Sequence, residues 1–112
     1  DVLEAMRADS GISLTALKVD GGACANDLLM QTQADIINAP VLRPRCAEST
    51  AMGAAYLAGL AAGYWKSTKD VERNWAVDRT FAPDLDGATR AERLKGWHKA
   101  VKYAFDWAKC DP

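Results

Sequence analysis

The stretch LKVDGGACAN, residues 17–26, decides how this chain folds. The apolar run that leads into it, Leu14–Val19, has the length of a buried strand, and Asp20 with two glycines closes that strand. Small residues follow, and then Asn26, a preferred N-cap residue at the start of a helix. A strand that runs into a glycine pair and then into a capped helix is typical of nucleotide- or phosphate-binding loops.

Two explanations fit the glycine pair, Gly21 and Gly22. Glycine reaches positive φ without steric cost and lets a ligand lie against the backbone, while the start of a helix offers free N–H groups to anions. Asn26 supplies both an acceptor and a donor, so it could contact the edge of an adenine or cap its own helix. From the glycines alone an ordinary tight turn is the simpler explanation, because the fingerprints GxxxxGKS/T and GxGxxG are both absent.

Helical and extended patterns alternate along the rest of the chain. Apolar spacing, cap residues and the breakers Gly11, Pro44 and Gly63 set the boundaries, and either Ser49 or Thr50 is expected to cap the third helix. The expected elements are helices at residues 1–9, 26–38, 48–63 and 89–109, strands at 14–19, 40–43 and 74–81, and one or two helical turns at 67–73. This order predicts an α/β fold with at least one parallel strand pair, an edge strand and a helical tail.

The segment expected to form the third helix has few large side chains. Gly53 and Gly59 lie inside it, and each interior glycine costs roughly 1 kcal/mol relative to alanine. Close approach of a neighbouring element to this smooth surface would offset that cost. We therefore expect tight packing against the helix and not a ligand site.

Composition argues against several classes of protein. The chain has 112 residues, of which 49% are hydrophobic, and its net charge of −1 gives no support for a nucleic-acid partner. No apolar run approaches the ~20 residues that cross a membrane, and no signal peptide is visible. Three cysteines without CxxC spacing and one histidine argue against disulfides and metal sites, so we expect reduced thiols in the cytoplasm. Because the chain opens inside or at the start of a helix, with DVLEAMRADSG, we expect it to be a segment of a longer protein.

Other reactive or charged side chains have structural explanations. Cys24 is expected to fill space within the glycine loop, and His98 to lie on the surface of the last helix. Arg43 and Arg45 could face anions, but solvated loop charges are the simpler interpretation. The four tryptophans are expected to pack, because no basic groove surrounds them for base stacking.

Three segments taken together resemble a known family. VDGGACANDLLMQTQADI, then VLRP, then ESTAMGAAYLAGLAAGYW resemble the C-terminal region of the FGGY carbohydrate kinases, most closely the members that phosphorylate glycerol. The resemblance is strong from Asp1 to Trp65 and looser through FAPDLD and GWHKAVKYAFDW. It implies an actin-like (ribonuclease H-like) ATPase fold of two lobes, in which residues 1–112 form the C-terminal part of the second lobe.

The resemblance also implies roles for the glycine loop. Gly22 and Asn26 would contact the adenine nucleotide, and Gly21 would shape the turn. The reaction would transfer the γ-phosphoryl group of ATP, with Mg²⁺, to a hydroxyl of glycerol. The family's polyol site and catalytic aspartate would precede Asp1, so we assign no catalytic or metal-binding residue to this chain and expect it to be inactive alone. Asp20 is not expected to act as the base.

Two alternatives remain at this stage. The chain could come from a sister kinase of a pentulose or another polyol, or from a non-catalytic actin-like nucleotide-binding module. In each case the strand that ends at Asp20 would lack a neighbour and expose a pairing edge. We therefore expect marginal stability of the isolated segment and a homo-oligomeric protein, with no nucleic-acid or membrane partner.

Overall fold

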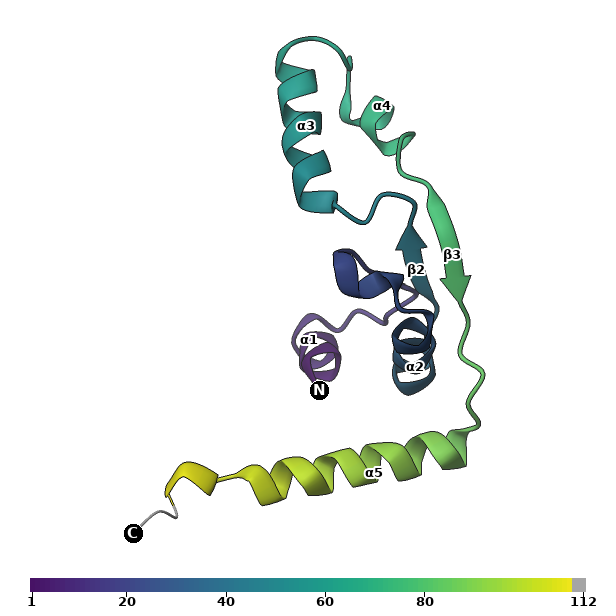
Figure 1. Cartoon of the computed structure of the whole chain (residues 1–112), viewed down its shortest axis with the longest axis vertical. Helices are drawn as coiled ribbons and strands as arrows, with labels where there is room; N and C mark the ends of the chain where they lie inside the picture. The colour runs from purple at the N-terminus through teal and green to yellow at the C-terminus, as the bar shows by residue number, and fades with distance from the viewer. Residues whose placement is uncertain (110–112) are drawn as a thin grey trace.

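A three-stranded sheet organises the chain, with the strands in the order β1-β2-β3. The computed structural model describes residues 1–109. Along the chain the elements are α1 (Val2–Ser10), β1 (Leu17–Lys18), the 3₁₀ turn η1 (Gly22–Ala25), α2 (Asp27–Ile37), β2 (Val41–Pro44), α3 (Ser49–Ala61), α4 (Thr68–Glu72), β3 (Val77–Phe81), α5 (Gly87–Ala104) and the 3₁₀ turn η2 (Trp107–Lys109). Figure 1 shows α2 beside the sheet, α3 and α4 beyond one end of it, and α5 crossing below the other end.

Strand pairing confirms the expected α/β arrangement. β1 pairs with β2 in parallel, with Leu17 opposite Val41, and the connection between them contains α2, as a parallel crossover requires. β2 pairs with β3 in the antiparallel direction, with Val41 opposite Phe81. β3 is therefore an edge strand, as predicted, and β1 has no second partner strand among residues 1–109.

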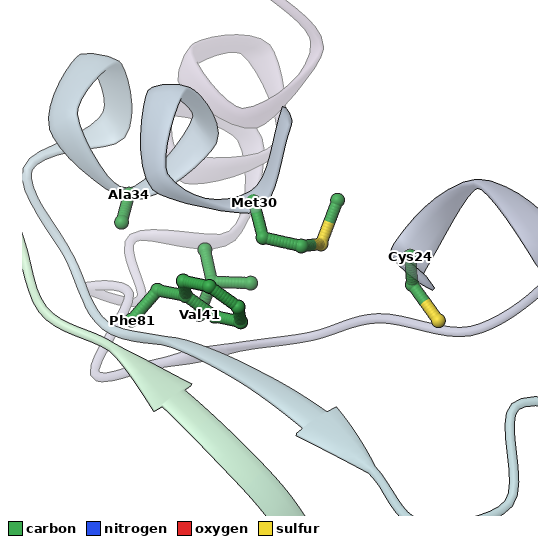
Figure 2. Packing of buried hydrophobic residues seen from close by; sticks show 5 residues of the cluster. All are labelled: Cys24, Met30, Ala34, Val41 and Phe81. Carbon is green, nitrogen blue, oxygen red and sulfur yellow. The ribbon is translucent and has the colours of Figure 1, made fainter. Parts of the chain in front are cut away.

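The buried core lies between α2 and the sheet. Met30 and Ala34 point from α2 toward Val41 of β2 and Phe81 of β3, and Cys24 joins the same cluster from η1 (Figure 2). Helix α2 starts where the sequence predicts, because the side chain of Asn26 accepts a hydrogen bond from the backbone N–H of Leu29. This apolar cluster thus fixes η1 and α2 against the centre of the sheet.

Several predicted boundaries are wrong. The first strand covers only residues 17–18 of the expected 14–19. Glu48, and neither Ser49 nor Thr50, is the N-cap of α3, because the Ser49 hydroxyl donates a hydrogen bond to Asp20 instead. Helix α5 begins at Gly87, capped by Asp86, and ends at Ala104, where the backbone of the next residue is extended.

Close packing against α3 occurs at only one of its two interior glycines. A Cβ atom on Gly59 would overlap the ring of Trp65, whereas nothing lies within 4 Å of the same position on Gly53. The neighbour at Gly59 is a side chain that follows the helix and not a separate element. The expected packing of a neighbouring element against this helix is therefore wrong at both glycines, although the Trp65 side chain does lie close to Gly59.

The described chain is extended for its length. Its radius of gyration is 18.7 Å, whereas a compact chain of this size has about 13 Å. Neither α3 nor α5 contains a buried residue. Large apolar side chains remain exposed on several elements, among them Leu28 at 76% and Trp107 at 81%. Much apolar surface is thus left unburied by the described residues.

Candidate functional site

The glycine loop between β1 and η1 is held against β2 and the segment that follows it. The N–H of Val19 donates to the carbonyl of Leu42 at 3.2 Å, and the N–H of Gly21 donates to the carbonyl of Ala47 at 2.7 Å. Gly21 has φ of 80°, a conformation that side-chain-bearing residues rarely adopt. The sequence predicted a turn that needs glycine, and Gly21 is the residue that meets this need.

Gly22 differs from Gly21 in a way that bears on function. It is the first residue of η1, it does not have positive φ, and nothing lies within 4 Å of a Cβ atom built on it. Neither the backbone of the described chain nor its packing therefore requires glycine at this position. The absence of a side chain here leaves open space beside the loop, which would allow a ligand to contact the protein backbone directly.

Asn26 both caps its helix and keeps a donor group. Its Oδ1 atom accepts from the N–H of Leu29 at 3.1 Å, and its side chain is exposed. The Nδ2 group makes no hydrogen bond with any residue of 1–109, so its two hydrogens are available to a ligand. The two roles that the sequence left open for Asn26 are compatible, because they use different atoms.

The Arg43 side chain forms hydrogen bonds with the glycine loop. Its interpretation as a solvated charge is therefore wrong. The side chain is only 15% exposed. Its Nη1 atom donates to the carbonyls of Cys24 and Ala25 at 3.1 and 3.4 Å and to Oδ1 of Asp27 at 2.7 Å. Its Nε atom donates to Asp78 at 2.8 Å. Arg45 is exposed, and its side chain makes no hydrogen bond with a residue that the structure describes, in agreement with the prediction for it.

Charge pairing shifts the pKa values of Arg43 and of its partner Asp27. The hydrogen bond from Arg43 lowers the pKa of the Asp27 carboxyl below its usual value, and Arg79, which also bonds Asp27, acts in the same direction. The same hydrogen bond raises the pKa of Arg43 above its usual value. Asp27 is thus held ionised between two arginines at the start of α2, where a negative charge is favourable.

A hollow of about 660 Å³ lies beside the loop, between the sheet and α3. Its lining includes Asp20, Ser49, Tyr56, Trp65 and Trp75. The hydrogen bond from Ser49 to Asp20 ties the loop to the start of α3 at this hollow. Gly21, Gly22 and Asn26 do not line it, so the predicted ligand-binding residues lie together on the loop but outside the hollow.

Of the other side chains singled out in the sequence, Cys24 and His98 have the structural roles expected of them, whereas the expected packing is wrong for Trp75, Trp97 and Trp107, which are exposed. Cys24 is 1% exposed and belongs to the apolar cluster. His98 lies on the surface, with Nε2 3.2 Å from a carboxylate oxygen of Asp1.

Within residues 1–109 no group of three or more His, Cys, Asp and Glu side chains could hold a metal ion. Over the same residues no helix has the length and apolar character needed to cross a membrane.

Comparison with known proteins gives one consistent result. A sequence model of the C-terminal domain of the FGGY family of carbohydrate kinases matches residues 1–62. The chain is 68% identical to a glycerol kinase of Agathobacter rectalis and 62% identical to glycerol kinase 1 of Clostridium tetani, each over 111 residues. Each alignment covers 99% of this chain and 22% of the relative, so the chain spans about a fifth of the length of these proteins.

Solved structures agree with this comparison. The crystal structure of Plasmodium falciparum glycerol kinase with ADP superposes with a TM-score of 0.79 and 33% identity, over 93% of this chain and 21% of that one. A xylulose kinase from Lactobacillus acidophilus has a TM-score of 0.66 and 22% identity, over 83% and 19% of the two chains, and shows a common fold alone.

Proposed function

This chain belongs to the FGGY family of carbohydrate kinases, and we propose that it forms the adenine-nucleotide-binding part of a glycerol kinase. The whole enzyme would transfer the γ-phosphoryl group of ATP to glycerol and form glycerol 3-phosphate and ADP. One observation carries the proposal: an open loop with the Gly22 backbone and a free Asn26 amide occurs in a chain 68% identical to a glycerol kinase. A pentulose kinase and a non-catalytic module have no observation that favours them.

We assign separate roles to the three loop residues. Gly21 sets the turn through its positive φ. Gly22 leaves room for the adenosine moiety to lie against the backbone. Asn26 donates from Nδ2 to an acceptor atom of adenosine while its Oδ1 atom caps α2. Together these residues bind and orient one end of the nucleotide.

Phosphoryl transfer needs further groups, which we place outside this chain. A base positions the glycerol hydroxyl for attack on the γ-phosphorus, and cations neutralise charge on the phosphates. We propose Mg²⁺ as the divalent ion, which proteins commonly bind through substrate phosphates and one or two carboxylates. Residues 1–109 offer no cluster suited to a metal, so no Mg²⁺ ligand is assigned among them. By itself the chain would not turn over.

We also propose a cytoplasmic, homo-oligomeric enzyme without a nucleic-acid or membrane partner. Cys24 and Cys46 are free thiols in the structure, as suits a reducing compartment. The net charge of −1 gives no electrostatic basis for binding nucleic acid. Large exposed apolar side chains such as Leu28 and Leu57 support contacts with further protein surface.

The proposal can be tested by grafting. The chain would replace the segment that it matches in the Agathobacter rectalis kinase, and release of ADP would be measured with glycerol and with a panel of pentuloses. We compare Asn26→Ala with Asn26→Ser, because serine keeps an N-cap acceptor but has no amide donor. The host supplies the acceptor site, so turnover with glycerol tests whether this chain completes the nucleotide site. We expect that turnover to be retained, and the KM for ATP to be raised in both variants.

Two results would contradict the proposal. A folded grafted kinase that neither binds ADP nor phosphorylates glycerol would show that this chain does not complete the nucleotide site of a glycerol kinase. An Asn26→Ser enzyme with an unchanged KM for ATP would show that Asn26 only caps its helix.

A further inference from the structure

We propose that Arg43 is a positioning residue that fixes the shape of the nucleotide-binding loop, an inference that rests on the proposed function. Arg43 lies on β2, and its Nη1 atom reaches the two carbonyls of Cys24 and Ala25. These carbonyls lie at the end of η1, between Gly22 and Asn26. Arg43 therefore holds the part of the loop that joins the two proposed ligand contacts.

The carbonyls at the end of a helical turn have no partner within that turn. Arg43 supplies one by donating to Cys24 at 3.1 Å and to Ala25 at 3.4 Å, and it reaches Asp27 at the start of α2 at 2.7 Å. One nitrogen thus joins the end of η1 to the start of α2. The backbone between Gly22 and Asn26 cannot shift without breaking charge-assisted hydrogen bonds, which are among the stronger ones in proteins.

Arg43 is itself fixed by the sheet and the core. Its Nε atom donates to Asp78 on β3 at 2.8 Å, and its guanidinium lies 5.3 Å from the centre of the Phe81 ring. A planar group bonded at two edges and stacked on a buried ring has little freedom to move. Arg43 therefore fixes the position of the glycine loop relative to the strands β2 and β3.

Loss of the Arg43 hydrogen bonds would weaken nucleotide binding, because the loop that contacts the nucleotide would no longer be fixed in one shape. A loop that samples several shapes must be ordered when ligand binds, and the ordering cost reduces affinity. Glycerol would not be affected in the same way, because its proposed site lies outside this chain. A positioning role for Arg43 therefore predicts a change in nucleotide affinity that is separate from the KM for glycerol.

Arg79 provides a matched control. It also donates to Asp27, and its guanidinium lies 4.7 Å from the centre of the same Phe81 ring. Unlike Arg43, it makes no hydrogen bond to a loop carbonyl within residues 1–109. Replacing Arg79 removes a similar charge, a similar ring contact and the other arginine partner of Asp27, but leaves the hold on η1 in place.

The experiment uses the grafted kinase with Arg43→Met, Arg43→Lys and Arg79→Met. The Kd for ADP is measured by titration calorimetry, and kcat and both KM values by the coupled assay. For Arg43→Met we expect a Kd for ADP and a KM for ATP that are about tenfold higher, the scale of one lost hydrogen bond to a charged group. The KM for glycerol and kcat should stay within about twofold. Arg43→Lys should recover part of the affinity, since an ammonium group can donate to the same carbonyls.

An unchanged Kd for ADP in Arg43→Met, or an equal rise in Arg79→Met, would overturn the inference. If Arg43→Met does not fold, Arg43→Lys decides: a raised Kd for ADP with an unchanged KM for glycerol supports the inference, and an unchanged Kd refutes it. Calorimetry with ADP needs no acceptor. A grafted kinase that binds ADP without phosphorylating glycerol would therefore contradict the proposed function and still decide the role of Arg43.

Discussion

The indole ring of Trp65 lies over Gly59, at a distance that leaves no space for a Cβ atom on residue 59. The chain turns back after α3, and the N–H of Trp65 donates to the carbonyl of Gly59 at 3.4 Å. The rings of Tyr56 and Tyr64 meet the indole edge-on, with centroids 5.1 and 4.9 Å away. Glycine at position 59 thus allows an aromatic cluster to close the end of the helix.

Alanine substitution should change the free energy of unfolding in opposite directions at the two glycines of α3. Gly59→Ala forces the Trp65 ring to move, and overpacking of this kind costs about 1–3 kcal/mol, more than the roughly 1 kcal/mol that helix propensity returns. Gly53→Ala has open space and should gain up to about 1 kcal/mol. Urea unfolding of the isolated chain, followed by circular dichroism at one protein concentration, measures both. Equal effects of the two substitutions would contradict the packing at Gly59.

Local signals in the sequence were sufficient where one residue determines the geometry. Gly11 ends α1 in the left-handed conformation and Asn26 caps α2, both as predicted. Prediction failed where a distant partner competes for a side chain. Ser49 is a good cap residue, but Asp20 takes its hydroxyl from a position 29 residues away. The residues around Ser49 in the sequence therefore cannot predict that its hydroxyl binds Asp20.

The candidate site was predictable in part for the same reason. The positive φ of Gly21 follows from the turn, and the family resemblance drew attention to Gly22 and Asn26. Arg43 was missed because its partners are 16 to 35 residues away in sequence. A signal was present: a charged residue in the short strand VLRP, with a second arginine on the neighbouring strand, is unusual unless carboxylates lie nearby.

The N-cap of α5 gives a second prediction. Oδ1 of Asp86 accepts from the N–H groups of Ala88 and Thr89 at 3.0 and 2.9 Å, and Oδ2 accepts from the Thr89 hydroxyl. Asp86→Ala should lower the free energy of unfolding by about 1 kcal/mol and reduce helical dichroism. Asp86→Ser, which keeps a cap acceptor, should lose much less. Equal losses in both variants would show that the cap geometry does not matter.

The carboxylate of Asp35 predicts a pH dependence. It accepts from the N–H of Asp84 at 2.8 Å and from Gln31 at 3.0 Å. These bonds, chiefly the one from Asp84, lower the pKa of Asp35 below its ordinary value of 3.8. Because the folded-state pKa is the lower one, the stabilisation is complete above the ordinary value and is lost as pH falls through the folded-state value.

The measurement is the difference in unfolding free energy between the wild type and Asp35→Asn from pH 7 down to pH 3. We expect a constant difference at neutral pH that shrinks below about pH 4. Asp9→Asn is the control, because the Asp9 side chain makes no hydrogen bond or ion pair within residues 1–109. A difference for Asp35→Asn that does not change with pH would contradict the assignment.

Gly22→Ala tests the space beside the loop. Nothing in the described chain meets a Cβ atom at this position, so the substitution should leave the unfolding midpoint of the isolated chain unchanged or slightly higher. In the grafted kinase the same methyl group would meet the nucleotide and raise the KM for ATP several-fold, about 1 kcal/mol or more of lost binding. An unchanged KM for ATP would mean that the nucleotide does not approach Gly22.

Self-association of the isolated chain should depend on the free edge of β1. The N–H groups of Leu17 and Val19 donate to the carbonyls of Pro40 and Leu42, so strand alternation directs the N–H of Lys18 to the unpaired side. An exposed strand edge is a template for pairing with another copy. We expect concentration-dependent sedimentation of the isolated chain at micromolar concentrations.

Substitution at residue 18 distinguishes edge pairing from contact between apolar surfaces. Lys18→Pro removes the outward N–H and leaves both hydrogen bonds to the β2 side intact, so it should weaken self-association. Lys18→Ala keeps that N–H but removes the lysine side chain, whose ammonium lies 4.3 Å from the centre of the Trp75 ring, and should associate like the wild type. If neither variant changes sedimentation, the exposed apolar side chains hold the copies together. A wild-type chain that stays monomeric over the same concentrations would refute the prediction itself.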